Sequence, residues 1–331
     1  MIEKNHPSIK YGNTGVLIIN LGTPDSTNWF DIRKYLREFL SDRRVIEVNP
    51  IIWQIILNLF ILNFRPSKTA KAYKEIWMND KNMSPLLYYT QKQAEKISSS
   101  FSKENIVIDF AMRYGNPSIK SKIHKLHKIG CENLVILPLY PQYAAATTAT
   151  VCDEVYRTLM KMRWQPSLKI IPHYESNQLY INALVNSINK KINEIRWKPD
   201  LIIASYHGIP KKYFDKGDPY HCYCHKTTRL ISEKFSSIKI KTTFQSRFGP
   251  QEWLQPYTDK ILENLPREGI KNVLTICPGF SSDCVETLEE IEIQAKESFL
   301  NSGGENFDMV PCLNDNNDHI NLLKSLIESN I

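Results

Sequence analysis

Residues 201–210 read LIIASYHGIP, a largely apolar run that ends in a histidine, a glycine and a proline. A near-continuous apolar run of this length suits a strand that is buried on both faces of a parallel sheet. Six other stretches have the same character. Together they predict strands at Val16–Leu21, Ile106–Met112, Leu134–Leu139, Leu168–Ile171, Leu201–Tyr206, Thr242–Gln245 and Val273–Cys277.

Amphipathic stretches separate these strands, with apolar residues at helical spacing. They predict helices at Trp29–Leu40, Ser118–Ile129, Thr148–Arg163, Gln178–Ile195, Thr227–Phe235, Pro256–Leu265, Cys284–Leu300 and His319–Ser329. Alternating strands and helices are typical of α/β proteins with right-handed crossovers. We therefore predict two Rossmann-like, doubly wound lobes with parallel sheets, residues 1–155 and 156–312. Residues 313–331 are predicted to return as a helix toward the first lobe.

Composition and charge exclude several classes of protein. The 331 residues are 42% hydrophobic and 23% charged, as in ordinary globular proteins. The net charge of +7 fits an anionic substrate or a membrane surface, but it is too small to indicate nucleic-acid binding. Seven scattered cysteines indicate a reducing compartment. Because the N-terminus has no apolar signal-peptide region, we expect a cytoplasmic protein.

The residues just beyond the strands are the candidates for ligand binding, because doubly wound sheets bind ligands at their carboxyl ends. No GxxxxGK(S/T) or GxGxxG motif follows a strand, which argues against ATP, GTP or NAD. Aromatic side chains do follow the strands and could wall a broad apolar cleft, although any one of them alone is better explained as a cap on the core. They are Tyr114, Tyr140, Tyr143, Phe248, Trp253 and Phe280, and Arg113 and Arg247 lie beside them.

One histidine and two glutamates could carry chemistry. His207 follows the strand at 201–206 and could accept a proton or bind a metal, the alternative being a structural histidine. Glu286 and Glu290 are four residues apart in a predicted helix and would share one face. Such carboxylates raise each other's pKa and could bind a cation or transfer protons. The alternative is an acidic first turn that the helix dipole favours.

Residues 218–225, DPYHCYCH, concentrate cysteine and histidine. This density could indicate a metal site around Cys222 and Cys224. A structural zinc site needs paired knuckles, however, and the chain has no second one. We therefore predict no zinc knuckle here, and the role of this stretch stays open.

Six strings resemble the ferrochelatase family and occur in that family's order. They are NLGTPD at 20–25, FLSDRRVI at 39–46, LPLYPQY at 137–143, SYHGIP at 205–210, TFQSRFG at 243–249 and CPGFSSDCVETLEE at 277–290. Several motifs in order are specific, whereas any one alone would not be. The resemblance implies a chelatase-like fold of two lobes around a porphyrin cleft. It also implies a lyase that inserts Fe²⁺ into protoporphyrin IX to form protohaem, the terminal step of haem biosynthesis.

The resemblance also implies roles for individual residues. His207 would lie at the ring centre as proton acceptor or metal ligand, Glu286 would be the carboxylate across the cleft, and Glu290 would lie one turn further along. We predict His207, Glu286 and Glu290 as catalytic residues, with His207 and Glu286 also as metal ligands. The predicted substrate-binding residues are Arg113 (facing a propionate), Tyr114, Tyr140, Tyr143, Phe248 and Trp253.

The cysteines bear on cofactors. Many members of the family carry a 2Fe–2S cluster on cysteines beyond the last helix. Here the last cysteine is Cys312 and no cysteine-rich extension follows it. We therefore predict no 2Fe–2S cluster and no permanently bound cofactor, with Fe²⁺ as a substrate. Some relatives have histidine where this chain has Cys284.

Residues 51–64, IIWQIILNLFILNF, form the most apolar stretch. They are too few to span a bilayer, which needs about 20 residues. They predict a largely apolar helix, either a core helix or a lip over the cleft that enters the membrane interface. Lys68, Lys71 and Lys74 would assist at anionic lipid. The residues expected to enter the interface are Ile51, Trp53, Ile55, Leu59 and Leu62.

Because protoporphyrin partitions into lipid, we favour the lip over the core helix as the interpretation of this stretch. We therefore predict peripheral association with the cytoplasmic membrane through residues 50–65. The same lip argues against coproporphyrin III, which carries four carboxylates. The alternative outside the enzymes is a non-catalytic protein that binds haem or porphyrin. The resemblance leaves open a contact with the preceding enzyme of haem synthesis.

Overall fold

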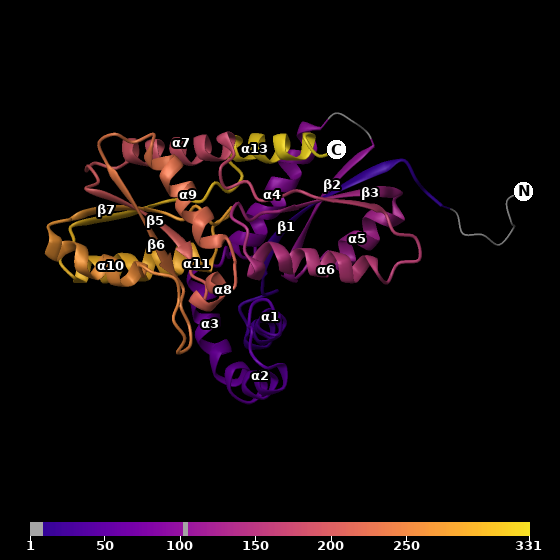
Figure 1. The fold of residues 1–331 in the computed structure, drawn as a ribbon, viewed down its shortest axis with the longest axis horizontal. Coiled ribbons are helices and arrows are strands. Elements are labelled where there is room, and N and C mark those ends of the chain that lie inside the picture. Colours follow the sequence, from indigo (N-terminus) through magenta and orange to yellow (C-terminus); the bar gives the residue numbers. More distant parts are fainter. Residues whose placement is uncertain (1–8, 102–104) are drawn as a thin grey trace, which may run out of the picture.

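The chain folds into two four-stranded parallel sheets that lie next to each other in the molecule (Figure 1). The computed structural model describes residues 9–101 and 105–331. The strand orders are β2-β1-β3-β4 and β6-β5-β7-β8. The strands are β1 Asn13–Thr23, β2 Ile106–Gly115, β3 Cys131–Pro138, β4 Ser167–Ile170, β5 Leu201–His207, β6 Lys239–Gln245, β7 Asn272–Ile276 and β8 Asn306–Val310. The predicted α/β fold with two parallel sheets is confirmed.

Both sheets use the same strand order, although no repeat is visible in the sequence. In each sheet the first strand lies between the second and the third, so the chain moves to one edge and then to the other. This reversal creates a topological switch point between β1 and β3 and between β5 and β7. Residues at the carboxyl ends of these strands therefore lie where such folds bind ligands.

Two strands correct the sequence-based prediction. β8 was not predicted, because Asn306 and Asp308 interrupt its apolar residues at this edge of the second sheet. β4 pairs with β3 through Leu134↔Leu168 and neighbouring residues. The first lobe therefore extends at least to Ile170, and the predicted boundary after residue 155 is too early.

The helices surround both sheets. They are α1 Trp29–Leu40, α2 Pro50–Ile56, α3 Leu62–Ile76, α4 Pro85–Ser100, α5 Ile119–Lys128, α6 Thr150–Leu159, α7 Gln178–Glu194, α8 Lys211–Asp215, α9 Tyr220–Ser232, α10 Thr258–Asn264, α11 Val285–Thr287, α12 Lys296–Asn301 and α13 Asn317–Glu328. Wider π-helical turns are η1 Leu57–Ile61, η2 Ala145–Ala149 and η4 Leu288–Ala295, and η3 Leu265–Glu268 is a 3-10 turn. Sequence reasoning placed α1 correctly but did not predict α4.

One central core joins the two lobes. Val16 and Ile18 of β1 belong to the same buried cluster as Ile202 and Tyr206 of β5. Because successive side chains of a strand alternate, Leu17 of β1 instead enters an outer core under α5 and α6. The lobes are therefore fused through one face of each sheet rather than linked by a flexible segment.

The last helix, α13, contacts helices from both halves of the chain. It packs on α7 and on α4, which covers β1 and β2. Just before it, Lys96 Nζ of α4 pairs with Asp315 Oδ2 at 2.6 Å. These contacts therefore tie the end of the chain to its first half.

The apolar stretch 51–64 extends from the body of the molecule as α2, η1 and the start of α3 (Figure 1). Ile51, Leu59 and Phe64 are 74%, 60% and 75% exposed, so this is not a buried core helix. Leu57 and Leu62, in contrast, have no exposed surface and anchor the stretch to the body. Among the described residues, none of the helices has the length and apolar character needed to cross a bilayer.

Candidate active site between the two lobes

His207 ends β5, at the carboxyl edge of the second sheet, and its side chain is half-buried. Its Nδ1 lies 2.6 Å from the carbonyl oxygen of Gly208. A neutral imidazole that donates through Nδ1 keeps a lone pair on Nε2, which can take up a proton or bind a metal. Gly208 is needed here because a Cβ would lie 2.9 Å from the carbonyl oxygen of Gln245.

Glu290 is held by the residues that end β6. The backbone N–H of Ser246 donates to Oε1 at 2.7 Å, and the Ser246 hydroxyl donates to Oε2. Burial raises the pKa of Glu290; the Ser246 hydrogen bonds and the charge of His207 lower it, and Glu286 raises it. The net effect is a raised pKa. A carboxyl group whose pKa is raised in this way is a candidate for proton transfer at neutral pH.

Glu286 lies in α11, close enough to three buried tyrosines for its charge to raise their pKa. Burial raises the pKa of Tyr35, Tyr73 and Tyr140, and the charge of Glu286 raises each further. Burial and then Glu286 also raise the pKa of Cys284. Glu286 is therefore a carboxylate in a largely apolar, aromatic surrounding.

The helix that carries both glutamates is not the regular α-helix that the sequence predicts. It changes to π-helical winding at Leu288, immediately after α11. Glu286 and Glu290 nevertheless stay close enough for their charges to interact. Wider turns of this kind are common at functional sites.

The side chain of Gln245 connects β5 to the segment that carries Glu286 and Glu290. Its Oε1 accepts from Ser205 Oγ at 2.7 Å, which orients the amide. Its Nε2 donates to the carbonyl oxygen of Glu286 at 2.6 Å and to Glu290 Oε2 at 3.4 Å. Sequence reasoning did not assign Gln245 or Ser246 a role in the site. The available signal was their position, since Gln245 ends the predicted strand Thr242–Gln245 and Ser246 directly follows it.

Arg113 and Tyr114 lie behind the site rather than in it. Both side chains are buried, and the Arg113 guanidinium pairs with Asp42 and donates from Nε to the carbonyl oxygen of Thr150 at 2.9 Å. The Tyr114 hydroxyl donates to Asp42 Oδ2 at 2.9 Å. Because the guanidinium charge is already compensated, the prediction that Arg113 faces a propionate is wrong for this structure. The same burial argues against Tyr114 as a substrate contact.

The remaining aromatic residues divide between buried and accessible positions. Tyr140 is buried, and its hydroxyl has no hydrogen-bond partner among the described residues. Tyr143 is half-buried. In the loop after β6, Trp253 Nε1 donates to the carbonyl oxygen of Phe248 at 3.0 Å. The Arg65 guanidinium of α3 lies 4.8 Å from the centre of the Phe248 ring, so this loop contacts α3 directly after the apolar stretch.

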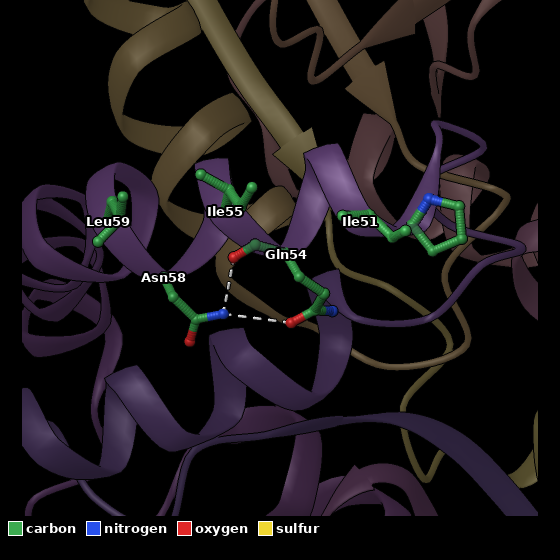
Figure 2. Close-up of a pocket in the computed structure, with 6 residues that line it drawn as sticks. Ile51, Gln54, Ile55, Asn58 and Leu59 are labelled. Carbon is green, nitrogen blue, oxygen red and sulfur yellow. Dashed lines mark hydrogen bonds between the residues drawn. The ribbon is translucent and has the colours of Figure 1, made fainter.

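An open, apolar groove runs along the apolar stretch, with a volume of about 610 Å³ (Figure 2). It is lined by Pro50, Ile51, Gln54, Ile55, Asn58 and Leu59. Asn58 Nδ2 donates to the carbonyl oxygen of Gln54 at 2.8 Å and to its Oε1 at 3.2 Å, so the polar side chains satisfy each other (Figure 2). The groove is thereby left apolar.

Comparison with known proteins decides the family. The ferrochelatase family model matches residues 13–331. A ferrochelatase of Allorhizobium ampelinum is 54% identical over 329 residues, which cover 98% of this chain and 96% of the relative. One of Francisella tularensis subsp. tularensis is 49% identical over 328 residues, 98% of each.

The chain belongs to the ferrochelatase family. As a ferrochelatase-family protein it is an enzyme, a lyase of haem biosynthesis whose substrates are iron and a porphyrin. The family and the class of enzyme predicted from the sequence are confirmed.

Solved structures support the fold of this ferrochelatase-family chain. SirB from Bacillus subtilis with Fe³⁺ superposes with a TM-score of 0.58 at 11% identity, covering 96% of this chain and 95% of SirB. CbiX, the terminal enzyme for biosynthesis of sirohaem in denitrifying bacteria, gives 0.52 at 10% identity, covering 96% and 99%. At these identities the likeness concerns the chelatase-like fold alone.

In this ferrochelatase-family chain, the fold places His207 beside Gln245, which contacts the segment that carries Glu286 and Glu290, and leaves Arg113 and Tyr114 in the interior. Within residues 9–101 and 105–331, no three histidine, cysteine, aspartate or glutamate side chains are grouped so that they could hold a metal ion.

Proposed function

We propose that this chain inserts Fe²⁺ into protoporphyrin IX, giving protohaem and two protons, at the carboxyl ends of β5 and β6, where His207 lies and where Gln245 contacts the segment of Glu286 and Glu290. The observation that carries the proposal is geometric: His207 pairs with Gln245 at the ends of β5 and β6, and Gln245 Nε2 donates to the carbonyl oxygen of Glu286 and to the carboxylate of Glu290. Free porphyrin has two pyrrole N–H protons, and its planar ring hides the nitrogen lone pairs from the metal. Insertion therefore needs a bent ring, a partly dehydrated Fe²⁺ and acceptors for both protons.

We assign roles to these groups from their chemistry. His207 Nε2 accepts a pyrrole proton or ligates Fe²⁺, since its lone pair is free when Nδ1 donates to Gly208. Glu286 is the carboxylate that faces it, as the second metal ligand or proton acceptor. Glu290, with its raised pKa, takes the proton onward toward solvent.

The accessible aromatic residues complete the substrate site. Phe248 and Tyr143 retain exposed surface and would contact the porphyrin ring, and Trp253 would support Phe248 through its Nε1 hydrogen bond. Tyr140 would contribute apolar surface near Glu286.

Anaerobic mixing of the purified chain with Fe²⁺ and protoporphyrin IX tests the proposal. We expect the absorption of protohaem to appear catalytically. Faster turnover of coproporphyrin III than of protoporphyrin would identify the rival chelatase. Stoichiometric porphyrin binding without metal insertion would identify a binding protein and contradict the proposal.

We further propose a cytoplasmic enzyme that associates peripherally with the membrane through residues 50–65. Ile51, Ile55, Leu59 and Phe64 expose 53% or more of their surface, which is costly in water and favourable in a lipid interface. Two residues of the predicted contact face are corrected. Trp53 Nε1 donates to the carbonyl oxygen of Leu40 at 2.6 Å, and Leu62 is fully buried, so neither is free to enter lipid.

Lys68, Lys71 and Lys74 of α3 are exposed and would attract anionic headgroups. The absence of a 2Fe–2S cluster and a contact with the preceding pathway enzyme stay predictions. Iron analysis of the purified protein and co-purification with that enzyme test them.

A further inference from the structure

The cysteine- and histidine-rich stretch at 218–225 folds into the start of α9, where it brings two histidines together. His221 and His225 are four residues apart, and their ring centres are 4.4 Å apart. The two cysteines do not join them. Cys224 is completely buried, and Cys222 follows His221 by one residue and so projects about 100° further around the helix.

Aromatic neighbours hold both imidazoles in place. The Phe244 ring of β6 lies 5.7 Å from the ring of His221 and 6.2 Å from that of His225. The Phe214 ring lies 5.2 Å from that of His221 on another side. Across the described residues, neither imidazole makes a hydrogen bond to the protein, so their ring nitrogens are free to bind a ligand.

The two rings keep solvent access while they are held. His221 is half-buried and His225 is exposed. Burial lowers the pKa of both, and the neighbouring His221 lowers that of His225 further. A lowered pKa favours the neutral imidazole, which is the form that binds metals. The nearest basic residue along the helix face, Arg229, is paired with Glu233.

We propose that His221 and His225 form a second, solvent-open site for a divalent transition metal. Two histidines one helical turn apart can place their nitrogens at the roughly 2.0–2.1 Å from one ion that zinc requires. Water would fill the remaining positions. Imidazole ligands select Cu²⁺, Ni²⁺, Zn²⁺ and Co²⁺, whereas Mg²⁺ and Ca²⁺ prefer oxygen ligands.

This site is separate from the one that contains His207. Phe244, which contacts the histidine pair, and Gln245, which holds Glu290, are successive residues of β6. Their side chains therefore point to opposite faces of the sheet. Metal at the histidine pair does not depend on the function proposed above, and its loss should leave the reaction centre intact.

Calorimetric titration of the untagged full-length chain with Ni²⁺ tests the proposal. The variants are His225→Gln and His221→Gln, and the matched control is His124→Gln, an exposed histidine on α5. Each of the first two should lose one bound Ni²⁺, or bind it at least about tenfold more weakly, whereas the control should match the unchanged chain. Mg²⁺ should not compete.

The His225→Gln variant keeps the result interpretable, because an exposed side chain can be replaced without disturbing the core. Circular dichroism should confirm its native fold. Its rate of Fe²⁺ insertion should also equal that of the unchanged chain, whatever that rate is, because the residue lies outside the reaction centre. Equal Ni²⁺ stoichiometry and affinity in all four proteins would overturn the proposal.

Discussion

Ser246 donates two hydrogen bonds to the carboxylate of Glu290, one from its backbone N–H at 2.7 Å and one from its hydroxyl. Ser246 adopts a left-handed backbone with φ of 63°, which few residues other than glycine do. Such strain persists where the surrounding structure requires it, and here it places both donors on one carboxylate. Glu290 is thus the most firmly positioned of the three predicted catalytic groups.

Replacement of His207 by alanine should abolish Fe²⁺ insertion and leave the fold intact. The side chain is half-buried at a strand end and contributes little to the core, whereas its Nε2 is the proposed proton acceptor or ligand. Circular dichroism should be native-like and turnover close to background. A variant that kept most of the original rate would remove His207 from the mechanism.

Glu286→Gln should lower kcat by at least about tenfold with little change in porphyrin affinity, because it removes charge and proton-accepting capacity but keeps size. Steady-state kinetics and porphyrin fluorescence titration measure the two effects separately. The matched control is Glu289→Gln, which makes the same replacement three residues further along the chain and should stay active. Lost porphyrin affinity with unchanged kcat would instead make Glu286 a support of the cleft.

Glu290→Gln should stabilise the protein at neutral pH while it slows insertion. The pKa of Glu290 is raised in the folded state, so the stability it contributes is present below its unfolded pKa and is lost as pH rises through the folded pKa. A neutral amide does not undergo this loss. Thermal unfolding at pH 7 should show a Tm higher by about 1–3 °C, and the difference should shrink at acid pH.

An unchanged or lower Tm of Glu290→Gln at pH 7 would mean that the bonds from Ser246 outweigh the cost of burying the charge. The comparison should therefore include Ser246→Ala, which removes one of those bonds and should raise the pKa of Glu290 further. In the Ser246→Ala variant, the acid limb of the pH profile of the insertion rate should therefore shift toward higher pH.

Replacement of Ile51, Ile55 and Leu59 by serine should release the protein from liposomes. Each exposed side chain that enters the interface removes apolar area worth roughly 25 cal/mol per Å² from water. The triple variant should move from the pellet to the supernatant in sedimentation with anionic vesicles. It should also raise KM for protoporphyrin presented in lipid more than for detergent-dispersed substrate.

A matched control for the lipid experiment replaces three exposed apolar residues elsewhere, Met160, Leu179 and Ile293, by serine. This control should sediment with the vesicles like the unchanged chain. If both triple variants sediment equally well, residues 50–65 do not mediate membrane binding and the proposed localisation is wrong.

Local patterns in the sequence were enough to predict most of the fold. The apolar run 201–206 became β5, and helix 29–40 was placed at its observed bounds, where Asn28 caps it by accepting from the N–H of Asp31 at 2.9 Å. Patterns failed where tertiary contacts override local preference. The start of α9 at Tyr220 was missed because its buried face at helical spacing, Tyr220, Cys224, Thr227 and Thr228, consists of residues that are not plainly apolar.

The amino-acid sequence by itself determined the α/β class, the positions of all strands but β8, and the family motifs. It also identified His207, Glu286 and Glu290 as candidates, because each of these depends on residues adjacent in the chain. Only the tertiary structure decided that Arg113 is neutralised by Asp42, 71 residues away, and that Ser246 holds Glu290, 44 residues away. A charged side chain is available to a substrate only if the fold does not bring an opposite charge beside it in the interior. That pairing forms across the chain, so no local pattern contains it.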